Sequence, residues 1–224
     1  MPIESHYPLI EIPFEHRYQC WFCGEPQDKE ITFPKEKSSC RLLTHAPLNV
    51  PSCQECSTLV KHDAFESIWA YRYALKKKLI VKHQKTLNIG ARWTKEELQE
   101  SQFEGSAFEG FKRSAWFMFE LQQARVNFAG WPVCIIGTGI ICDDAQAEFT
   151  FDGTTYADFD SAIASVVSAF YLDELLFTRV LGVLGKEKFG HAIRLCRLYP
   201  NLTTSARDAV FKEILSSLGI DDPQ

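Results

Sequence analysis

Residues 20–24 are CWFCG and residues 53–56 are CQEC, and together these two short segments indicate how the first part of the chain folds. Each stretch contains a Cys-x-x-Cys pair, which can place two thiolates on one tight turn. Gly24, directly after the second sulfur, suits a turn that needs a positive φ angle. Two such pairs supply the four sulfur ligands of a tetrahedral structural zinc site. The predicted zinc ligands are Cys20, Cys23, Cys53 and Cys56.

The other readings of the eight cysteines are a redox pair or unrelated buried thiols. Residues 1–20 have acidic residues and prolines where a signal peptide needs an apolar core, so we expect a reducing, cytoplasmic location. In such a compartment, paired cysteines indicate a metal site rather than disulfides. Cys40 lies between the two pairs and could replace a ligand. The other cysteines are predicted core residues: Cys134, Cys142 and Cys196.

The order of segments around the cysteines predicts a treble clef. A first knuckle, a hairpin in the intervening residues and a second knuckle are followed by a helix that we expect to begin near Ser57. The gap of 29 residues between Cys23 and Cys53 exceeds the spacing of about 15–20 in common zinc ribbons, but a longer insertion is compatible with this fold.

Beyond the cysteines, helical patterns dominate. Apolar residues recur near the helical period from about Phe65, with a stop expected at Asn88 and Gly90. A capping box of Thr94 and Glu97 predicts a short helix, and a longer one is expected from about residue 106 to residue 130.

The last third changes character. Residues 133–142 are apolar and β-branched, which predicts a strand, and residues 148–156 predict a hairpin around an Asp-Gly turn. From residue 158 we expect one long helix to about residue 184, then two further helices. The chain is therefore predicted to be α+β: a small zinc treble-clef unit joined to a mainly α-helical body with a short β element. Its expected parts are residues 1–62, 63–132 and 133–224.

Positive charge gathers in one segment. The net charge is −5, yet residues 61–95 hold nine Lys or Arg and two Asp or Glu, a balance of 9 − 2 = +7. Such a segment is a candidate polyanion contact, although many charge runs are only solvated helix faces. The side chains expected to project to solvent and bind nucleic acid are Arg72, Lys76, Lys78, Lys82 and Lys85.

The motifs CWFCGEP and THAPLNVPSCQECSTLVK, within residues 20–61, resemble the HNH family of nucleases in its zinc-bearing form. The resemblance implies that His45 is a general base and that Asn49 orients it. His62 could substitute for the residue that often follows the last cysteine. A Mg²⁺ or Mn²⁺ ion, separate from the structural zinc, would stabilise the charge on the phosphate.

Three features depart from that family. Thr44 stands where an acidic residue or a histidine usually precedes the base, the run from His45 to Asn49 is short, and Ser57 follows the last cysteine. Each departure removes a group that the reaction needs, so a loop or capping role for His45 is the favoured alternative.

The sequence thus predicts a zinc-stabilised, nucleic-acid-associated protein of HNH-like descent that binds DNA or RNA. Two alternatives are an active HNH endonuclease and a protein-interaction module with purely structural zinc. A protein partner or a homodimer could use the C-terminal helices. The most apolar run, in residues 161–177, is broken by Asp173 and Glu174, so no membrane association is expected.

Overall fold

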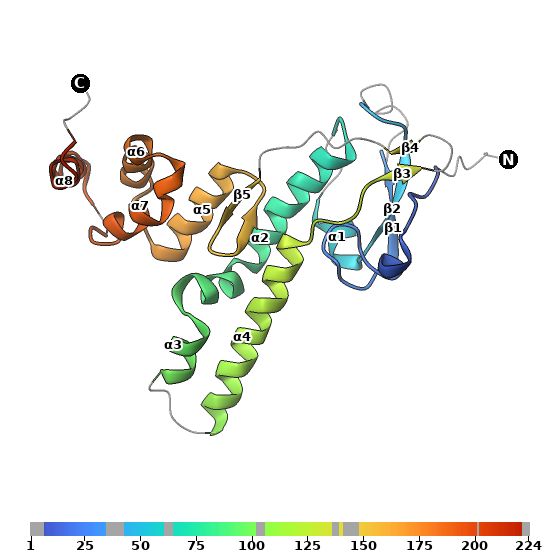
Figure 1. Ribbon diagram of the computed structural model, residues 1–224, viewed down its shortest axis with the longest axis horizontal. Coiled ribbons are helices and arrows are strands. Elements are labelled where there is room, and N and C mark those ends of the chain that lie inside the picture. Colours follow the sequence, from blue (N-terminus) through green and yellow to red (C-terminus); the bar gives the residue numbers. More distant parts are fainter. Residues whose placement is uncertain are drawn as a thin grey trace. The chain divides into compact units, whose positions relative to one another are not determined.

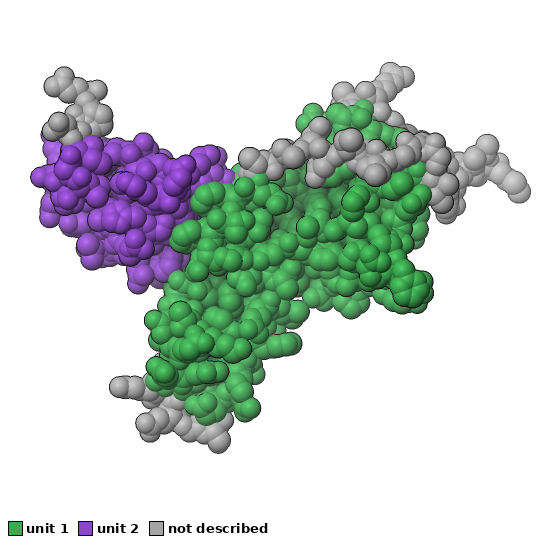
Figure 2. All heavy atoms as spheres, in the orientation of Figure 1, with its two compact units in different colours: residues 1–158 green, residues 159–224 purple. Residues whose placement is uncertain are grey.

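The computed structural model describes residues 7–34, 43–60, 65–101, 106–135, 139–140, 148–200 and 202–220. Helices and small two-stranded sheets make up this part of the chain, which confirms the α+β class (Figure 1). The chain forms two compact units, residues 1–158 and residues 159–224 (Figure 2). The finer division at residues 62 and 132 stays a prediction.

The first unit contains the knuckle, hairpin and helix in the predicted order. A 3-10 turn, η1 (Phe14–His16), precedes the first knuckle. Strand β1 (Lys29–Phe33) pairs antiparallel with β2 (Leu48–Ser52). Helix α1 (Gln54–Leu59) follows directly and so begins before Ser57, its predicted start. The earlier start arises because Cys53 is the N-cap, and its sulfur accepts the N–H of Cys56.

Two long helices, α2 (Ile68–Arg92) and α4 (Ser106–Asn127), pack against each other, and α3 (Lys95–Glu100) lies against α4. The capping box at the start of α3 is confirmed. The predicted helix stop at Asn88 and Gly90 is wrong, because α2 continues through both residues. Gly90 serves packing instead, since a Cβ there would lie 2.0 Å from the ring of Phe119.

Two further pairs of strands complete this unit. The predicted hairpin at residues 148–156 is confirmed as β5 (Phe149–Phe151) and β6 (Thr154–Tyr156). Its turn residues Asp152 and Gly153 have φ angles of 49° and 71°, as a tight hairpin turn requires. The apolar stretch before it forms β3 (Cys134–Ile135) and β4 (Gly139–Ile140); residues 136–138 and 141–147, including Cys142, lie outside the described residues.

The second unit is helical. It contains α5 (Phe159–Phe170), α6 (Glu174–Leu184), η3 (Lys186–Lys188), α7 (Phe189–Cys196) and α8 (Thr204–Ser217) around a core that includes Phe177 and Phe189. The expectation of one long helix to residue 184 is wrong. Tyr171 has a φ angle of 55°, and the side chain of Asp173 accepts the N–H of Leu176 to start a new helix.

Candidate metal centre

The four predicted ligands come together at one buried point. Cys20 and Cys23 lie on the first knuckle, where Gly24 has a φ angle of 73° and donates its N–H to the carbonyl of Cys20. Cys53 and Cys56 lie at the start of α1. All four sulfur atoms are within 4.8 Å of one another, and all four residues are buried.

The sulfur geometry fits a zinc ion. Zn–S bonds of about 2.3 Å in a tetrahedron place neighbouring sulfurs about 3.8 Å apart. The sulfurs of Cys23 and Cys53 are 3.7 Å apart. The N–H of Cys56 also points to the Cys53 sulfur at 3.4 Å, which stabilises negative charge on that atom. Four sulfur ligands would close the coordination sphere, as in structural rather than catalytic zinc sites.

The thiols hold their protons unequally. Hydrogen bonds from Cys20, Cys23 and Cys56 lower the pKa of Cys53, whereas the hydrogen bond to Cys20 raises the pKa of Cys56. A metal bound by all four thiolates must displace the remaining protons, so its affinity depends on pH.

A charged network links this cluster to the long helices. Arg125 of α4, only 7% exposed, donates to the carboxylate of Glu55 in α1 and lies 4.0 Å from the sulfur of Cys23. Lys82 and His83 of α2 contact the same carboxylate at 2.7 Å and 2.9 Å. Burial raises the pKa of Glu55, but hydrogen bonds from Lys82 and Arg125 outweigh it and lower that pKa to about 2.

No sequence pattern predicted this network. Glu55 stands inside the second Cys-x-x-Cys pair, and an acidic residue in the first turn of a helix was the one local signal for it. Nothing local marks Arg125 as its partner. The guanidinium offsets the net negative charge that four thiolates and one Zn²⁺ would carry.

His45 is half-buried and engaged at both ring nitrogens. Its Nδ1 atom donates to the carbonyl of Ala46 at 2.8 Å, and its Nε2 atom accepts the backbone N–H of Ile68, also at 2.8 Å. Its ring stacks on Phe33 and meets Trp69 edge-on, with centroid distances of 5.7 Å and 5.4 Å. Burial lowers the pKa of His45, against the opposing effect of the Ala46 carbonyl. The lone pair that a general base would use is therefore occupied.

Asn49 makes different contacts from those that the resemblance implies. Its side-chain amide donates to the carbonyl of Tyr7 at 2.9 Å, and its backbone pairs with Pro8 and Ile10. Asn49 thus holds the N-terminal segment against β2, and no hydrogen bond joins it to His45 among the described contacts. His62, the third predicted member, lies outside the described residues, as does Cys40.

Two of the five predicted basic contacts turn inward. Lys76 donates to the carbonyls of Arg125, Val126 and Phe128 at 3.0, 2.7 and 2.8 Å. Arg72 donates to the Phe128 carbonyl at 2.8 Å and covers the ring of Trp21. The expectation that Arg72 and Lys76 project to solvent is wrong, because the last carbonyls of a helix lack intrahelical donors and attract cationic side chains.

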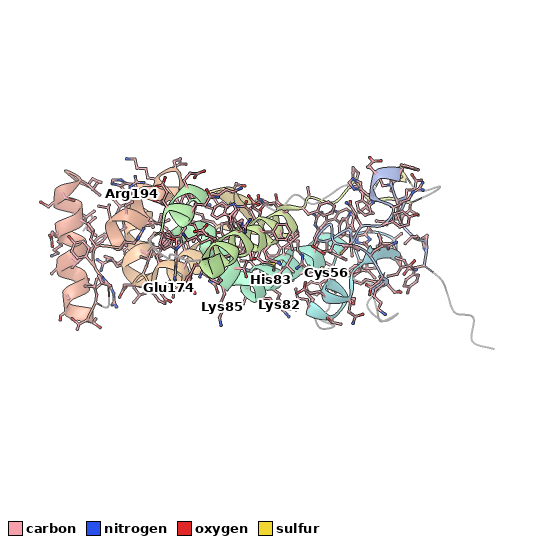
Figure 3. All side chains as sticks on the ribbon, turned by 90° about the horizontal axis from the view of Figure 1, so that it is seen from below. Cys56, Lys82, His83, Lys85, Glu174 and Arg194 are labelled. Carbon is pink, nitrogen blue, oxygen red and sulfur yellow. The ribbon has the colours of Figure 1, made fainter. Side chains whose placement is uncertain are left out.

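The other three basic residues stay exposed. Lys78, Lys82 and Lys85 recur at intervals of four and three residues, so they share one side of α2. Lys82 and Lys85 extend from this same side in Figure 3. Lys82 is 51% exposed even though it contacts Glu55.

Comparison of the chain with models of known protein families, with curated proteins and with solved structures finds no match. No helix in the described part of the chain is both long and apolar enough to cross a membrane. Across the same residues, the four cysteines are the one group of three or more potential metal ligands brought together, and they could hold a zinc ion.

Proposed function

We propose that this protein is a non-catalytic binding protein, built on a structural zinc site, that associates with nucleic acid. The observation that carries the non-catalytic part is the engagement of both ring nitrogens of His45 with backbone groups. A histidine held in this way stabilises a loop and a helix start, and it has no lone pair to accept a proton from water.

The ligand set of the metal centre supports the same reading. Four buried sulfurs leave no coordination position for water or a phosphate oxygen. An active HNH endonuclease would also need oxygen or nitrogen ligands for Mg²⁺ or Mn²⁺ beside its base. The order of knuckle, hairpin and helix agrees with HNH-like descent, and we propose that the scaffold was kept without the catalytic groups.

The proposed nucleic-acid contact is the exposed side of α2 that carries Lys78, Lys82 and Lys85. Lysines that neutralise phosphates release counterions, so binding weakens as salt increases, by a slope of about −0.9 per phosphate on duplex DNA. Three lysines therefore support a modest, sequence-independent affinity with a slope of about −3 or smaller in magnitude.

The test compares two triple variants by fluorescence anisotropy with labelled duplex DNA and single-stranded RNA at several salt concentrations. Lys78, Lys82 and Lys85 are changed to Glu in the first variant. In the control, three exposed lysines elsewhere, Lys29, Lys188 and Lys212, are changed to Glu with the same total change in charge. We expect the first variant to lose at least about tenfold in affinity at low salt, and the control to lose much less.

Three outcomes would replace the proposal. Equal losses in both variants would mean that only net charge matters. Absence of binding by the wild type at low salt would favour the protein-interaction alternative. Magnesium- or manganese-dependent cleavage that disappears in His45→Ala, with zinc content intact, would favour the nuclease.

A further inference from the structure

One side of α4 is uncharged over four turns and lies opposite the buried side of the helix that carries Phe119 and Val126. The residues along it are separated by alternating intervals of four and three, the heptad spacing of helices that pack along their length. They are Gly110, Ser114, Phe117, Leu121 and Ala124, of which Phe117 is 61% exposed. Phe111 and Met118 widen the same face and are 66% and 42% exposed. Exposed apolar residues that follow a helical repeat mark a contact surface.

Gly110 adds an independent observation. A Cβ atom at this position would meet nothing within 4 Å in the described part of the chain. Glycine weakens a helix interior, and nothing in the described structure requires it here. A missing side chain does allow the backbone of a second helix to approach closely. This position therefore favours a helix as the occupant of the face.

We propose that a second copy of this chain binds here, with the two α4 helices antiparallel. The face has small residues in its first half, Gly110 and Ser114, and large ones in its second half, Phe117 and Leu121. In an antiparallel pair, Gly110 faces the partner's Leu121, and Ser114 faces the partner's Phe117. Each large side chain then fills the space above a small one. In a parallel pair, large residues would face large residues and small residues would face small ones.

Charge at the edge of the face agrees with this arrangement. Arg113 and Glu120 are exposed and stand seven residues apart, about two helical turns, so they flank the face on one side. The antiparallel pair places Arg113 beside the partner's Glu120 twice, once on each side of a two-fold axis. Within its own chain, one oxygen of Glu120 accepts from Trp116 Nε1 at 2.7 Å and lies 3.5 Å from Lys95, and the Glu120 side chain is still 51% exposed.

The face belongs to one helix, so the dimer is a weak one, at the small end of specific interfaces. The proposal does not depend on nucleic-acid binding, because α2 carries the lysines and α4 carries this face. The proposed α4 interface is also distinct from a homodimer interface through the C-terminal helices.

The first test measures the oligomeric state of the full chain by sedimentation equilibrium between about 1 and 200 µM. We expect a monomer–dimer equilibrium in the wild type. Gly110→Leu should raise the dimer dissociation constant at least about tenfold while helix content is kept or increased, since leucine is the better helix former. Gly182→Leu, in α6, is the matched control, because a Cβ there also meets nothing within 4 Å, and it should leave the equilibrium unchanged.

The second test addresses the direction of the helices. Arg113→Glu and Glu120→Arg should each weaken the dimer, and the double variant should regain the loss, because each charge then meets its opposite on the partner. A wild type that is monomeric throughout this range overturns the proposal. That result would be expected if another protein, and not a second copy of this chain, occupied the face. Equal effects of the two glycine variants also overturn it, and a double variant as weak as the singles overturns the antiparallel arrangement.

Discussion

The backbone N–H of Ile68 donates to Nε2 of His45 at 2.8 Å, so a histidine in the loop before β2 caps the first turn of α2. The first amides of a helix have no partner within the helix. Ser67 satisfies the N–H of Ala70, and His45 satisfies that of Ile68. The residue to which the family resemblance assigns catalysis thus joins the hairpin region to the long helices.

Replacing His45 tests this role directly. We expect His45→Ala to lower the free energy of unfolding by about 1–2 kcal/mol, because a helix cap and a half-buried ring are lost. Chemical denaturation followed by circular dichroism gives the stability, and elemental analysis should give an unchanged zinc content. His191→Ala, at a partly exposed position in α7, is the control and should cost less. An unchanged stability in His45→Ala would contradict the capping role.

From the four clustered cysteines, we expect the purified protein to contain about one equivalent of zinc per chain. Cys23→Ser should lose that zinc and expose the first unit to proteolysis, because metal binding and folding are linked in such a site. Cys134→Ser removes a thiol outside the cluster and should retain the metal. A zinc-free protein that resists proteolysis as well as the zinc-bound one would disprove a structural role for the ion.

The contact between Arg125 and Glu55 should be worth more than an exposed ion pair. Arg125→Ala leaves a largely buried carboxylate with one partner fewer, and we expect a loss of about 3 kcal/mol. Zinc affinity, measured by competition with a chelator, should fall about tenfold, since the guanidinium beside Cys23 is lost. Arg179→Ala breaks the exposed pair with Asp208 and should cost less than about 1 kcal/mol. Similar losses of stability in both variants would show that the buried contact contributes no more than an exposed ion pair.

The stability of the second unit should depend on pH through Asp173. Hydrogen bonds from Arg207 and from the start of α6 lower the pKa of Asp173 below its ordinary value of 3.8. A depressed folded-state pKa gives a stabilisation that is present above the unfolded-state pKa and is lost as the pH falls through the folded one. The melting temperature of the protein should therefore decrease below about pH 4, and this decrease should be smaller in Asp173→Asn. An identical acid profile in this variant would refute the contribution.

Local patterns were predicted well. The two Cys-x-x-Cys pairs, the capping box of Thr94 and Glu97, and the turn at Asp152 and Gly153 each depend on residues only a few positions apart. At such distances, residue type and spacing largely decide the geometry of the backbone. The wrong predictions were also local in origin: Gly90 was interpreted as a helix stop because its contact with Phe119 could not be known.

Residue types and their spacing alone predicted the four clustered cysteines, the order of knuckle, hairpin and helix, and the α+β class. The contacts of the polar residues around them depend on tertiary packing. His45 meets Ile68 across 23 residues, Lys76 meets Arg125 across 49, and Arg125 meets Glu55 across 70. A buried hydrogen bond or ion pair is set by where packed elements bring unpaired groups together, and no periodicity in the chain encodes that meeting.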